Sequence, residues 1–277
     1  MKTKLDFLLY SPPKTGSTSL ACMLDMHPQI SAITIPNESK EPGLFNTRNI
    51  ISDEEIIQYN GCFKDDSTLK FEKSTSYFSS PSAAKHIKNF CKEDIKFITV
   101  LRNPVDKLIS LYKYFRIIST IHEKKLDNQA AEILQFEVPN DEVFYNFPTI
   151  KELLNDNTSW EWVLYSGVYH QHLDRLYRLF NSQSILLINY DDFKTNTLHC
   201  LESILNFLNV DTQALDKSSS NIVANSSQLW EELCFKLDIP LSCIHIEDKY
   251  LHQIKEHYYR HNDLLKQKYS FDHNWND

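Results

Sequence analysis

The sequence predicts a three-layer α/β fold, in which helices cover both faces of a central parallel sheet. Short apolar runs alternate with segments of helical periodicity, from Leu5–Tyr10 near the N-terminus to Ser184–Asn189 (SILLIN). The clearest run, Lys96–Leu101 (KFITVL), is apolar and β-branched between charged flanks, as in a strand buried on both faces. With 277 residues and 42% hydrophobic content, the chain is expected to form one domain over residues 1–277, and it contains no internal repeat.

Caps, prolines and periodicity predict the remaining elements in order. A brief strand is expected at Thr68–Glu72, and a turn at Tyr190–Phe193 after the last strand. The predicted helices cover Ser17–His27, Asp53–Tyr59, Ser80–Cys91, Asn103–Ile118, Trp160–Phe180, Thr197–Asn209, and residues 227–237 and 248–268. Parallel sheets of this kind bind ligands beyond the carboxyl ends of their strands, so we expect the site there.

The stretch LDFLLYSPPKTGSTSL, residues 5–20, combines a strand, a turn at Pro12-Pro13 and the start of a helix. Backbone N–H groups and the positive end of the helix dipole converge at such a junction, which suits a phosphate or sulfate. Lys14 adds a full charge, and Gly16 lets the backbone approach the anion closely. Because Lys14 precedes Gly16, this is not a Walker A loop, and the order disfavours ATP or GTP hydrolysis.

A second anion motif, LRNPVDKLISLY, spans Leu101–Tyr112. Arg102 emerges at the end of a predicted strand, and Pro104 suits the start of a helix. Ser110 lies about two helical turns after Arg102, so both side chains can face one phosphate dianion. Each motif alone is compatible with ordinary turn chemistry. Together, about ninety residues apart, they indicate a ligand with two anionic groups.

Charge and composition exclude several classes of partner. The net charge of −8 gives no footprint for nucleic acid and disfavours a polyanionic substrate. The apolar run after Met1 is too short for a signal peptide, and no window reaches the length of a transmembrane helix, so we expect a cytoplasmic protein with no membrane partner. The six cysteines lack CxxC spacing, so no zinc or other metal is expected.

At these motifs the chain resembles the PAPS-dependent sulfotransferases. PKTGSTSL is similar to their 5′-phosphosulfate loop and LRNPVDKLISLY to their 3′-phosphate motif. The likeness is strongest to the heparan sulfate 3-O- and N-sulfotransferase branch, through KEPGLF (40–45) and EKSTSYFSSPSAAKHI (72–87). GVYHQHLDRLYRLF (167–180) and ILLINYDDF (185–193) are also similar to sulfotransferase segments. The resemblance covers roughly residues 5–210 and implies a P-loop-like core.

The resemblance assigns roles to matching positions. It implies that Lys14 contacts the sulfate and bridging oxygen of PAPS, and that Arg102 and Ser110 hold the 3′-phosphate. It implies that Glu41 is the catalytic base and that Lys73 lies near the reacting centre. The residues that would bind the cofactor are Lys14, Thr15, Gly16, Ser17, Thr18, Ser19, Arg102 and Ser110.

Each assignment has a structural alternative. Lys14 could be a solvated loop lysine, Arg102 and Ser110 a helix-start arginine and a buried hydroxyl, and Glu72-Lys73 a surface pair. Glu38 and Glu72 are rivals of Glu41 as the base. The aromatic side chains of Trp160, Trp162 and Tyr165 are placed in the core rather than in an acceptor pocket, and a structural role is favoured over catalysis for two helix-face histidines, His170 and His172.

The chain also departs from the heparan branch. It lacks that branch's C-terminal Lys-Gly-Arg loop; residues 221–227 (NIVANSS) are a weak substitute. Cys234 and Cys243 match a disulfide of the branch, but a cytoplasmic location argues against oxidation, and their pairing stays open. Residues 120–160 are interpreted as an insertion that shapes the acceptor site, with a solvated excursion as an equal alternative.

The sequence therefore predicts a sulfotransferase that moves a sulfuryl group from PAPS, releasing PAP, without a metal. The expected acceptor is a small molecule with a hydroxyl or amine, such as a secondary metabolite or a cationic guanidinium alkaloid from natural product biosynthesis. Alternatives are a glycan sulfotransferase of the heparan type, a P-loop kinase and a non-catalytic nucleotide-binding module. The acceptor, O- versus N-sulfation and the oligomeric state are left open.

Overall fold

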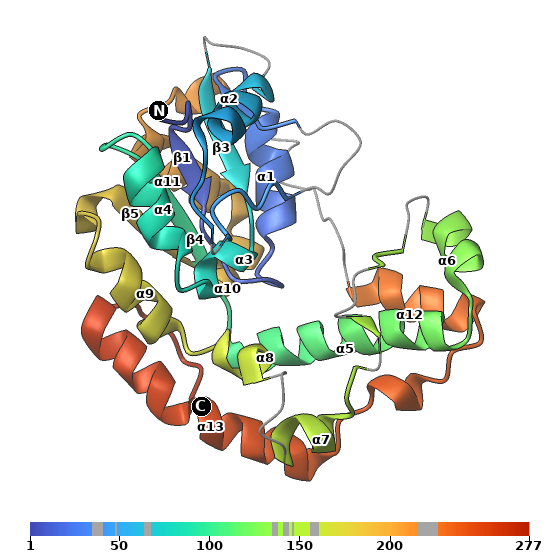
Figure 1. The fold of residues 1–277 in the computed structure, drawn as a ribbon. Helices are drawn as coiled ribbons and strands as arrows, with labels where there is room; N and C mark the ends of the chain where they lie inside the picture. The colour runs from blue at the N-terminus through green and yellow to red at the C-terminus, as the bar shows by residue number, and fades with distance from the viewer. Residues whose placement is uncertain are drawn as a thin grey trace.

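A parallel sheet of five strands, in the order β2-β3-β1-β4-β5, lies at the centre of the α/β part of the protein (Figure 1). The strands are β1 (Phe7–Leu9), β2 (Ile30–Ala32), β3 (Leu69–Lys73), β4 (Lys96–Leu101) and β5 (Ile185–Asn189). The computed structural model describes residues 1–34, 41–47, 49–63, 68–134, 138–140, 144–145, 147–155, 161–214 and 227–276.

The register of the sheet brings three strand ends together. Leu9 of β1 pairs with Lys73 of β3 on one side and with Ile98 of β4 on the other. Because all three strands are parallel, the chain leaves them at the same edge of the sheet. The two anion motifs and Lys73 therefore start from neighbouring strand ends, where such sheets bind ligands.

Helices cover both faces of the sheet, as predicted. One face packs on α1 and α11 through an apolar cluster that includes Phe71, Leu20 and Leu201. The other face packs on α2, α4 and α9 through a second cluster that includes Phe97 and Leu173. The helices of this part are α1 (Ser17–Asp25), α2 (Asp53–Gly61), α3 (Ser76–Ser79), α4 (Ala83–Phe90), α9 (Tyr169–Tyr177), α10 (Tyr190–Thr195) and α11 (Thr197–Leu208).

A second group of helices forms a lobe beside the sheet. Figure 1 shows α5 running out from the edge of the sheet, with α12 along it and α13 beneath. This lobe has its own apolar cluster, to which α6 and α7 of the predicted insertion contribute Ala130, Leu134, Ile150 and Leu153. The described helices of residues 120–160 therefore pack into a core rather than project into solvent. The lobe helices are α5 (Pro104–Glu123), α6 (Asp127–Leu134), α7 (Ile150–Asn155), α8 (Glu161–Tyr165), α12 (Ser227–Lys236) and α13 (Asp248–Tyr269).

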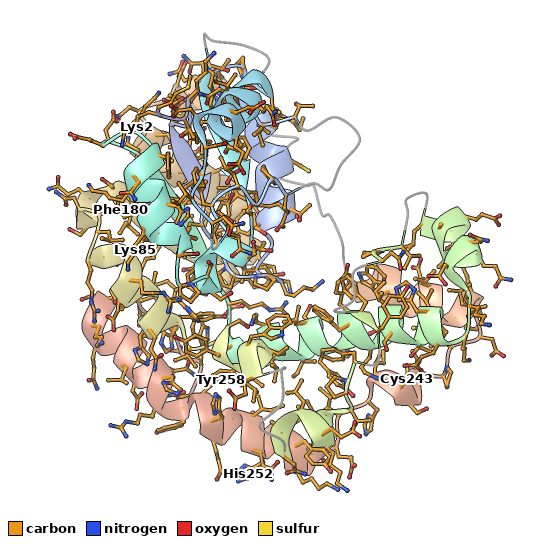
Figure 2. The ribbon with its side chains drawn as sticks, viewed as in Figure 1. Lys2, Lys85, Phe180, Cys243, His252 and Tyr258 are labelled. Atoms are coloured by element: carbon orange, nitrogen blue, oxygen red, sulfur yellow. The ribbon has the colours of Figure 1, made fainter. Side chains whose placement is uncertain are left out.

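The continuous helix predicted over Trp160–Phe180 is wrong. Within the described residues, α8 ends at Tyr165 and α9 begins at Tyr169. At the break, a Cβ on Gly167 would lie 2.8 Å from the ring of Tyr258 on α13. Tyr258, labelled in Figure 2, also donates a hydrogen bond to the carbonyl of Leu164 at 2.7 Å. The close packing of Tyr258 from α13 against Gly167 thus sets the break between α8 and α9.

Other boundaries differ in smaller ways. The expected turn at Tyr190–Phe193 is the start of α10, which the Asn189 side chain caps by accepting from the Asp191 amide at 3.0 Å. The helix after Pro104 continues beyond residue 118 to Glu123 because residues 117–122 are all buried in the lobe. Strand β2 and helices α3, α6 and α7 were not predicted, and short 3-10 turns lie at Ser182–Ser184, Thr212–Ala214 and Leu241–Ile244.

Candidate active site

The loop between β1 and α1 is fixed by bonds to its neighbours. Ser11 Oγ accepts a hydrogen bond from the Val100 amide at 2.9 Å, and Thr15 Oγ1 donates to the Pro12 carbonyl at 2.8 Å. Lys14 and Gly16 both have left-handed backbone angles, with φ of 67° and 78°. A Cβ on Gly16 would lie 3.1 Å from the Tyr190 ring. Both the angle and the tight contact therefore favour glycine at this position.

The loop delivers the chain to the N-terminus of α1. Gly16 is the N-cap, and no side chain among the described residues caps this end of the helix. Ser17, Thr18 and Ser19 form the first turn, with Ser17 and Ser19 buried and Thr18 half-buried. First-turn amides and the helix dipole attract an anion, and the hydroxyls add donors. The predicted anion loop thus has the expected conformation.

Lys14 and Arg102 place two cations at this loop. Arg102 follows β4 and donates from Nη1 to the carbonyl oxygen of Lys14 at 3.2 Å. Its guanidinium carbon lies 4.9 Å from the centroid of the Tyr190 ring. The Lys14 ammonium stands 4.6 Å from the centroid of the Tyr114 ring on α5. The structure therefore brings the two sequence motifs into direct contact.

The environment of Lys14 favours an anionic ligand. Burial and the nearby charge of Arg102 lower the pKa of Lys14 from 10.5 to about 8. Both effects penalise the ammonium form in the empty site, and an anion beside it would relieve them. Ser110, on α5 beyond Arg102, is half-buried, and its hydroxyl makes no hydrogen bond to the residues that the structure describes.

Glu41 and Lys73 form an ion pair beside α1. Lys73 Nζ donates to Glu41 Oε1 at 2.8 Å, and their side chains are 9% and 30% exposed. The same ammonium donates to Thr18 Oγ1 at 3.3 Å. Thr75 holds the other carboxylate oxygen, with its amide and its Oγ1 both 2.9 Å from Glu41 Oε2. Glu41 is therefore oriented by three donors, and Lys73 links it to the anion loop.

The rivals of Glu41 lie elsewhere. The side chain of Glu72 is 1% exposed and belongs to the opposite face of β3 from Lys73, because side chains alternate along a strand. It cannot reach an acceptor in solvent. Glu38 lies outside the described residues, as do Lys40 of the KEPGLF segment, Trp160 and residues 221–226.

The histidines and aromatic residues considered for this site lie in packed regions. His172 is fully buried, bonds to the Tyr165 carbonyl at 2.8 Å, and has its pKa lowered to about 3 by burial. His170 meets His261 of α13 at 3.0 Å. Trp162 packs edge-on against Phe115 of the lobe, with ring centroids 5.8 Å apart. The Tyr165 ring packs edge-on against the His172 ring, with centroids 4.6 Å apart. The contacts of these residues thus lie among α8, α9, α13 and the lobe.

The remaining predictions concern sulfur, metals and membranes. Cys234 and Cys243 are both free thiols, and Cys243 lies in the helical lobe (Figure 2). Within the described parts of the chain, no group of three or more histidine, cysteine or acidic side chains has a metal-binding arrangement. Over the same residues, every helix is too short or too polar to cross a bilayer.

Three site residues were missed by sequence reasoning. Thr75 belongs to the segment EKSTSYF that also carries Lys73, but the sequence does not indicate its contact with Glu41. Tyr190 follows the last strand in ILLINYDDF, a segment noted without an assigned residue. Tyr114 carries no signal beyond being an aromatic residue on α5. All three act through contacts between segments distant in sequence.

Comparison with known proteins gives a consistent family. The family model described as the sulfotransferase domain matches residues 4–229. The bifunctional heparan sulfate N-deacetylase/N-sulfotransferase 1 of Caenorhabditis elegans is 29% identical over 210 residues, which are 76% of this chain and 22% of that protein. The mouse N-deacetylase/N-sulfotransferase 3 is 29% identical over 215 residues, 74% of this chain and 22% of that protein. The chain thus spans about a fifth of the length of these relatives.

A solved structure supports the fold. The crystal structure of a sulfotransferase from Alicyclobacillus acidocaldarius matches with a TM-score of 0.52 and 17% identity, covering 89% of this chain and 98% of that chain. The family model spans most of the chain, and the heparan sulfate relatives agree with the resemblance seen in the motifs. The protein therefore belongs to the sulfotransferase domain family, which confirms the family expected from the sequence.

Proposed function

We propose that this protein transfers a sulfuryl group from PAPS to a hydroxyl or amine of a small-molecule acceptor. The observation that carries the proposal is the position of Lys73, which bonds to Glu41 at 2.8 Å and to Thr18 of the anion loop at 3.3 Å. A carboxylate that can accept a proton thus lies one side chain away from a site built for an anion. Sulfuryl transfer requires a proton acceptor for the attacking group close to the site that binds the donor.

The residues present fit PAPS as the donor. The loop from Lys14 to Ser19 would bind the 5′-phosphosulfate through amides, hydroxyls and the Lys14 ammonium. Arg102, with Ser110 two helical turns later, would hold the 3′-phosphate. The Arg102 guanidinium lies next to the loop, where it contacts the Lys14 carbonyl. A second cation there could bind a second phosphate group, which supports PAPS over a nucleoside triphosphate.

The chain's own groups supply the chemistry of transfer. Glu41 would take the proton of the attacking hydroxyl or amine as the new oxygen–sulfur or nitrogen–sulfur bond forms. The bond from sulfur to the bridging oxygen breaks in the same step, and Lys14 would stabilise the negative charge left on that oxygen. Lys73 and Thr75 keep the Glu41 carboxylate oriented. Positioning and charge stabilisation dominate such transfers.

The acidic balance of the chain supports a neutral or cationic acceptor, including a guanidinium compound. With a net charge of −8, long-range repulsion acts against a polyanionic chain. We further propose that residues 1–277 act as one domain in which the 120–160 segment borders the acceptor site.

A glycan acceptor is the second candidate, because the curated relatives are named heparan sulfate N-sulfotransferases. The test uses labelled PAPS with three acceptor sets: hydroxylated small molecules, amines that include guanidinium compounds, and N-desulfated heparan. Label is expected in a small-molecule product with wild-type protein, and its rate of incorporation should fall by about 10²- to 10⁴-fold with Glu41→Gln. Turnover on the glycan alone would overturn the small-molecule acceptor while keeping the sulfotransferase.

A further inference from the structure

Arg102 stands where the chain turns from the sheet into the helical lobe. Strand β4 ends at Leu101 and α5 begins at Pro104, with Asn103 as the N-cap. The carbonyl of Arg102 therefore lies outside the hydrogen-bond patterns of both the strand and the helix. A backbone carbonyl in such a position takes its hydrogen bond from another part of the fold. Because the peptide group is planar, that bond fixes the backbone from which the arginine side chain extends.

The donor to this carbonyl is Tyr169, the first residue of α9. Its hydroxyl donates to the Arg102 carbonyl at 2.8 Å. The side chain is 1% exposed, and its ring packs edge-on against Phe78 and Trp275, with centroids 5.9 and 6.1 Å away. A ring packed between other rings in a dense core has one well-defined position. The core therefore sets where the hydroxyl lies.

A second bond joins the same region of the fold to α5. Lys107 lies one helical turn after Asn103, is fully buried, and donates from Nζ to Ser166 Oγ. The Ser166 hydroxyl in turn donates to the Val163 carbonyl at 2.8 Å. Ser166 and Tyr169 flank the break between α8 and α9, and Figure 1 shows α8 beside the start of α5. The break thus presents two polar side chains to the beginning of α5.

The guanidinium end of Arg102 is also held. Its Nη1 donates to the Lys14 carbonyl at 3.2 Å, and its central carbon lies 4.9 Å from the centroid of the Tyr190 ring. Its remaining N–H groups make no hydrogen bond to the residues that the structure describes, so they are available to a ligand. A planar guanidinium recognises a phosphate through paired N–H groups, which makes the orientation of its plane important.

We propose that Tyr169 is a positioning residue for Arg102 and thereby sets the selectivity for a nucleotide with a 3′-phosphate. The Tyr169 hydroxyl fixes the backbone of Arg102 at one end of the residue, and Lys14 and Tyr190 orient the guanidinium at the other. The phosphate contacts Arg102, and Tyr169 acts through it. The inference rests on the proposed role of Arg102 in holding the 3′-phosphate of PAPS.

Two conservative variants at the break test the proposal. Tyr169→Phe keeps the ring and removes the hydroxyl that donates to Arg102. Tyr258→Phe is the matched control, because Tyr258 is also fully buried and donates to a backbone carbonyl, that of Leu164, at 2.7 Å. Each variant removes one buried hydroxyl and leaves one carbonyl without its donor. The two differ in which carbonyl is affected.

The measurements are the Kd values for PAP and AMP by calorimetry, with turnover of labelled PAPS. Tyr169→Phe should weaken PAP binding by about 3- to 10-fold, the usual range for one hydrogen bond. AMP lacks the 3′-phosphate, so its Kd should stay within about twofold of wild type. Tyr258→Phe should bind both nucleotides within about twofold of wild type. Both variants should melt at similarly lower temperatures. In Tyr169→Phe, KM for PAPS should rise and kcat should stay within about twofold.

A double variant tests whether Tyr169 acts through Arg102. Arg102→Ala removes the guanidinium, so adding Tyr169→Phe to it should change the Kd for PAP by less than about twofold. Residues that act through one another give non-additive effects of this kind, whereas independent residues give additive ones. The ratio of the PAP and AMP Kd values does not depend on the fraction of folded protein, so a general loss of stability cannot imitate the expected result.

The outcomes separate this inference from the proposed function. The positioning role would be overturned by an unchanged Kd for PAP in Tyr169→Phe, by equal losses for PAP and AMP, by the same loss of selectivity in Tyr258→Phe, or by additive losses in the double variant. In each of these cases the wild-type preference for PAP would leave the donor site standing. Wild-type protein that binds PAP no more tightly than AMP would instead refute the 3′-phosphate site, and this inference with it.

Discussion

The two halves of the site are built in different ways. The donor half consists of the loop from residue 11 to 19, one continuous segment that joins β1 to the first turn of α1, and of Arg102 at the end of the neighbouring strand β4. The catalytic half consists of Glu41, which is placed by side chains more than thirty residues later, at Lys73 and Thr75. The donor half is therefore built mainly from one continuous segment, whereas the catalytic half depends on contacts between residues more than thirty positions apart.

This difference predicts how each half responds to change. Substitutions in the donor half should weaken nucleotide binding. Substitutions in the catalytic half should lower turnover and leave binding intact, because its groups orient a carboxylate rather than hold phosphates. Lys73 contacts both halves, through Thr18 and Glu41.

The largest effect is expected from Glu41→Gln. Loss of a positioned general base lowers kcat by about 10²- to 10⁴-fold. The Kd for PAP should stay at its wild-type value, measured by calorimetry alongside turnover of labelled PAPS. Glu54→Gln, an exposed change on α2, is the control. Unchanged turnover in Glu41→Gln would show that Glu41 is not the general base.

Arg102→Ala should weaken the binding of nucleotides that carry a 3′-phosphate. A charge-assisted hydrogen bond contributes about 1.5–3 kcal/mol, so affinity for PAP should fall about 10- to 100-fold. AMP lacks the 3′-phosphate, and its affinity should change much less. Arg102→Lys should recover part of the loss because it keeps the charge. An equal loss for PAP and AMP would show that Arg102 acts only by holding the loop.

Thr75→Val should lower kcat about tenfold, because Glu41 loses a hydroxyl donor at 2.9 Å and keeps the Thr75 amide. Thr75→Ser retains the hydroxyl and serves as the matched control. PAP affinity should be the same in all three proteins. A weaker affinity in Thr75→Val would mean that the two halves are not separable.

The smallest effect concerns pH and the donor half. The pKa of Lys14 is lowered to about 8, so its ammonium is present below that pH and is lost as the pH rises through it. The kcat/KM for PAPS should therefore fall above about pH 8, by at most about tenfold per pH unit. Lys14→Arg keeps its charge and should remove this falling limb. The same limb in both proteins would assign it to another group.

The local character of the donor half explains why it could be predicted. The strand, the loop with Lys14 and Gly16, and the first turn of α1 follow one another within the chain, so their chemistry is visible as a motif. Arg102 was found because it comes directly after the apolar strand KFITVL, which is β4 in the structure. The parallel pairing of β1 with β4 then brings the two motifs together.

The parts that could not be predicted depend on contacts across the fold. The break between α8 and α9 is set by Tyr258, about ninety residues after Gly167. The contact of Tyr190 with Arg102, and that of Tyr114 with Lys14, join different segments. Glu72 was considered as a base because sequence does not show on which face of a strand a carboxylate lies when both faces are covered.

The central claim is that the protein binds a nucleotide through two separate phosphate sites, and calorimetric titration tests it most directly. Wild-type protein should bind PAP more tightly than AMP or ATP, with one site per chain. Arg102→Ala should abolish the preference for PAP over AMP. Tighter binding of ATP than of PAP would contradict the claim and favour a phosphotransferase.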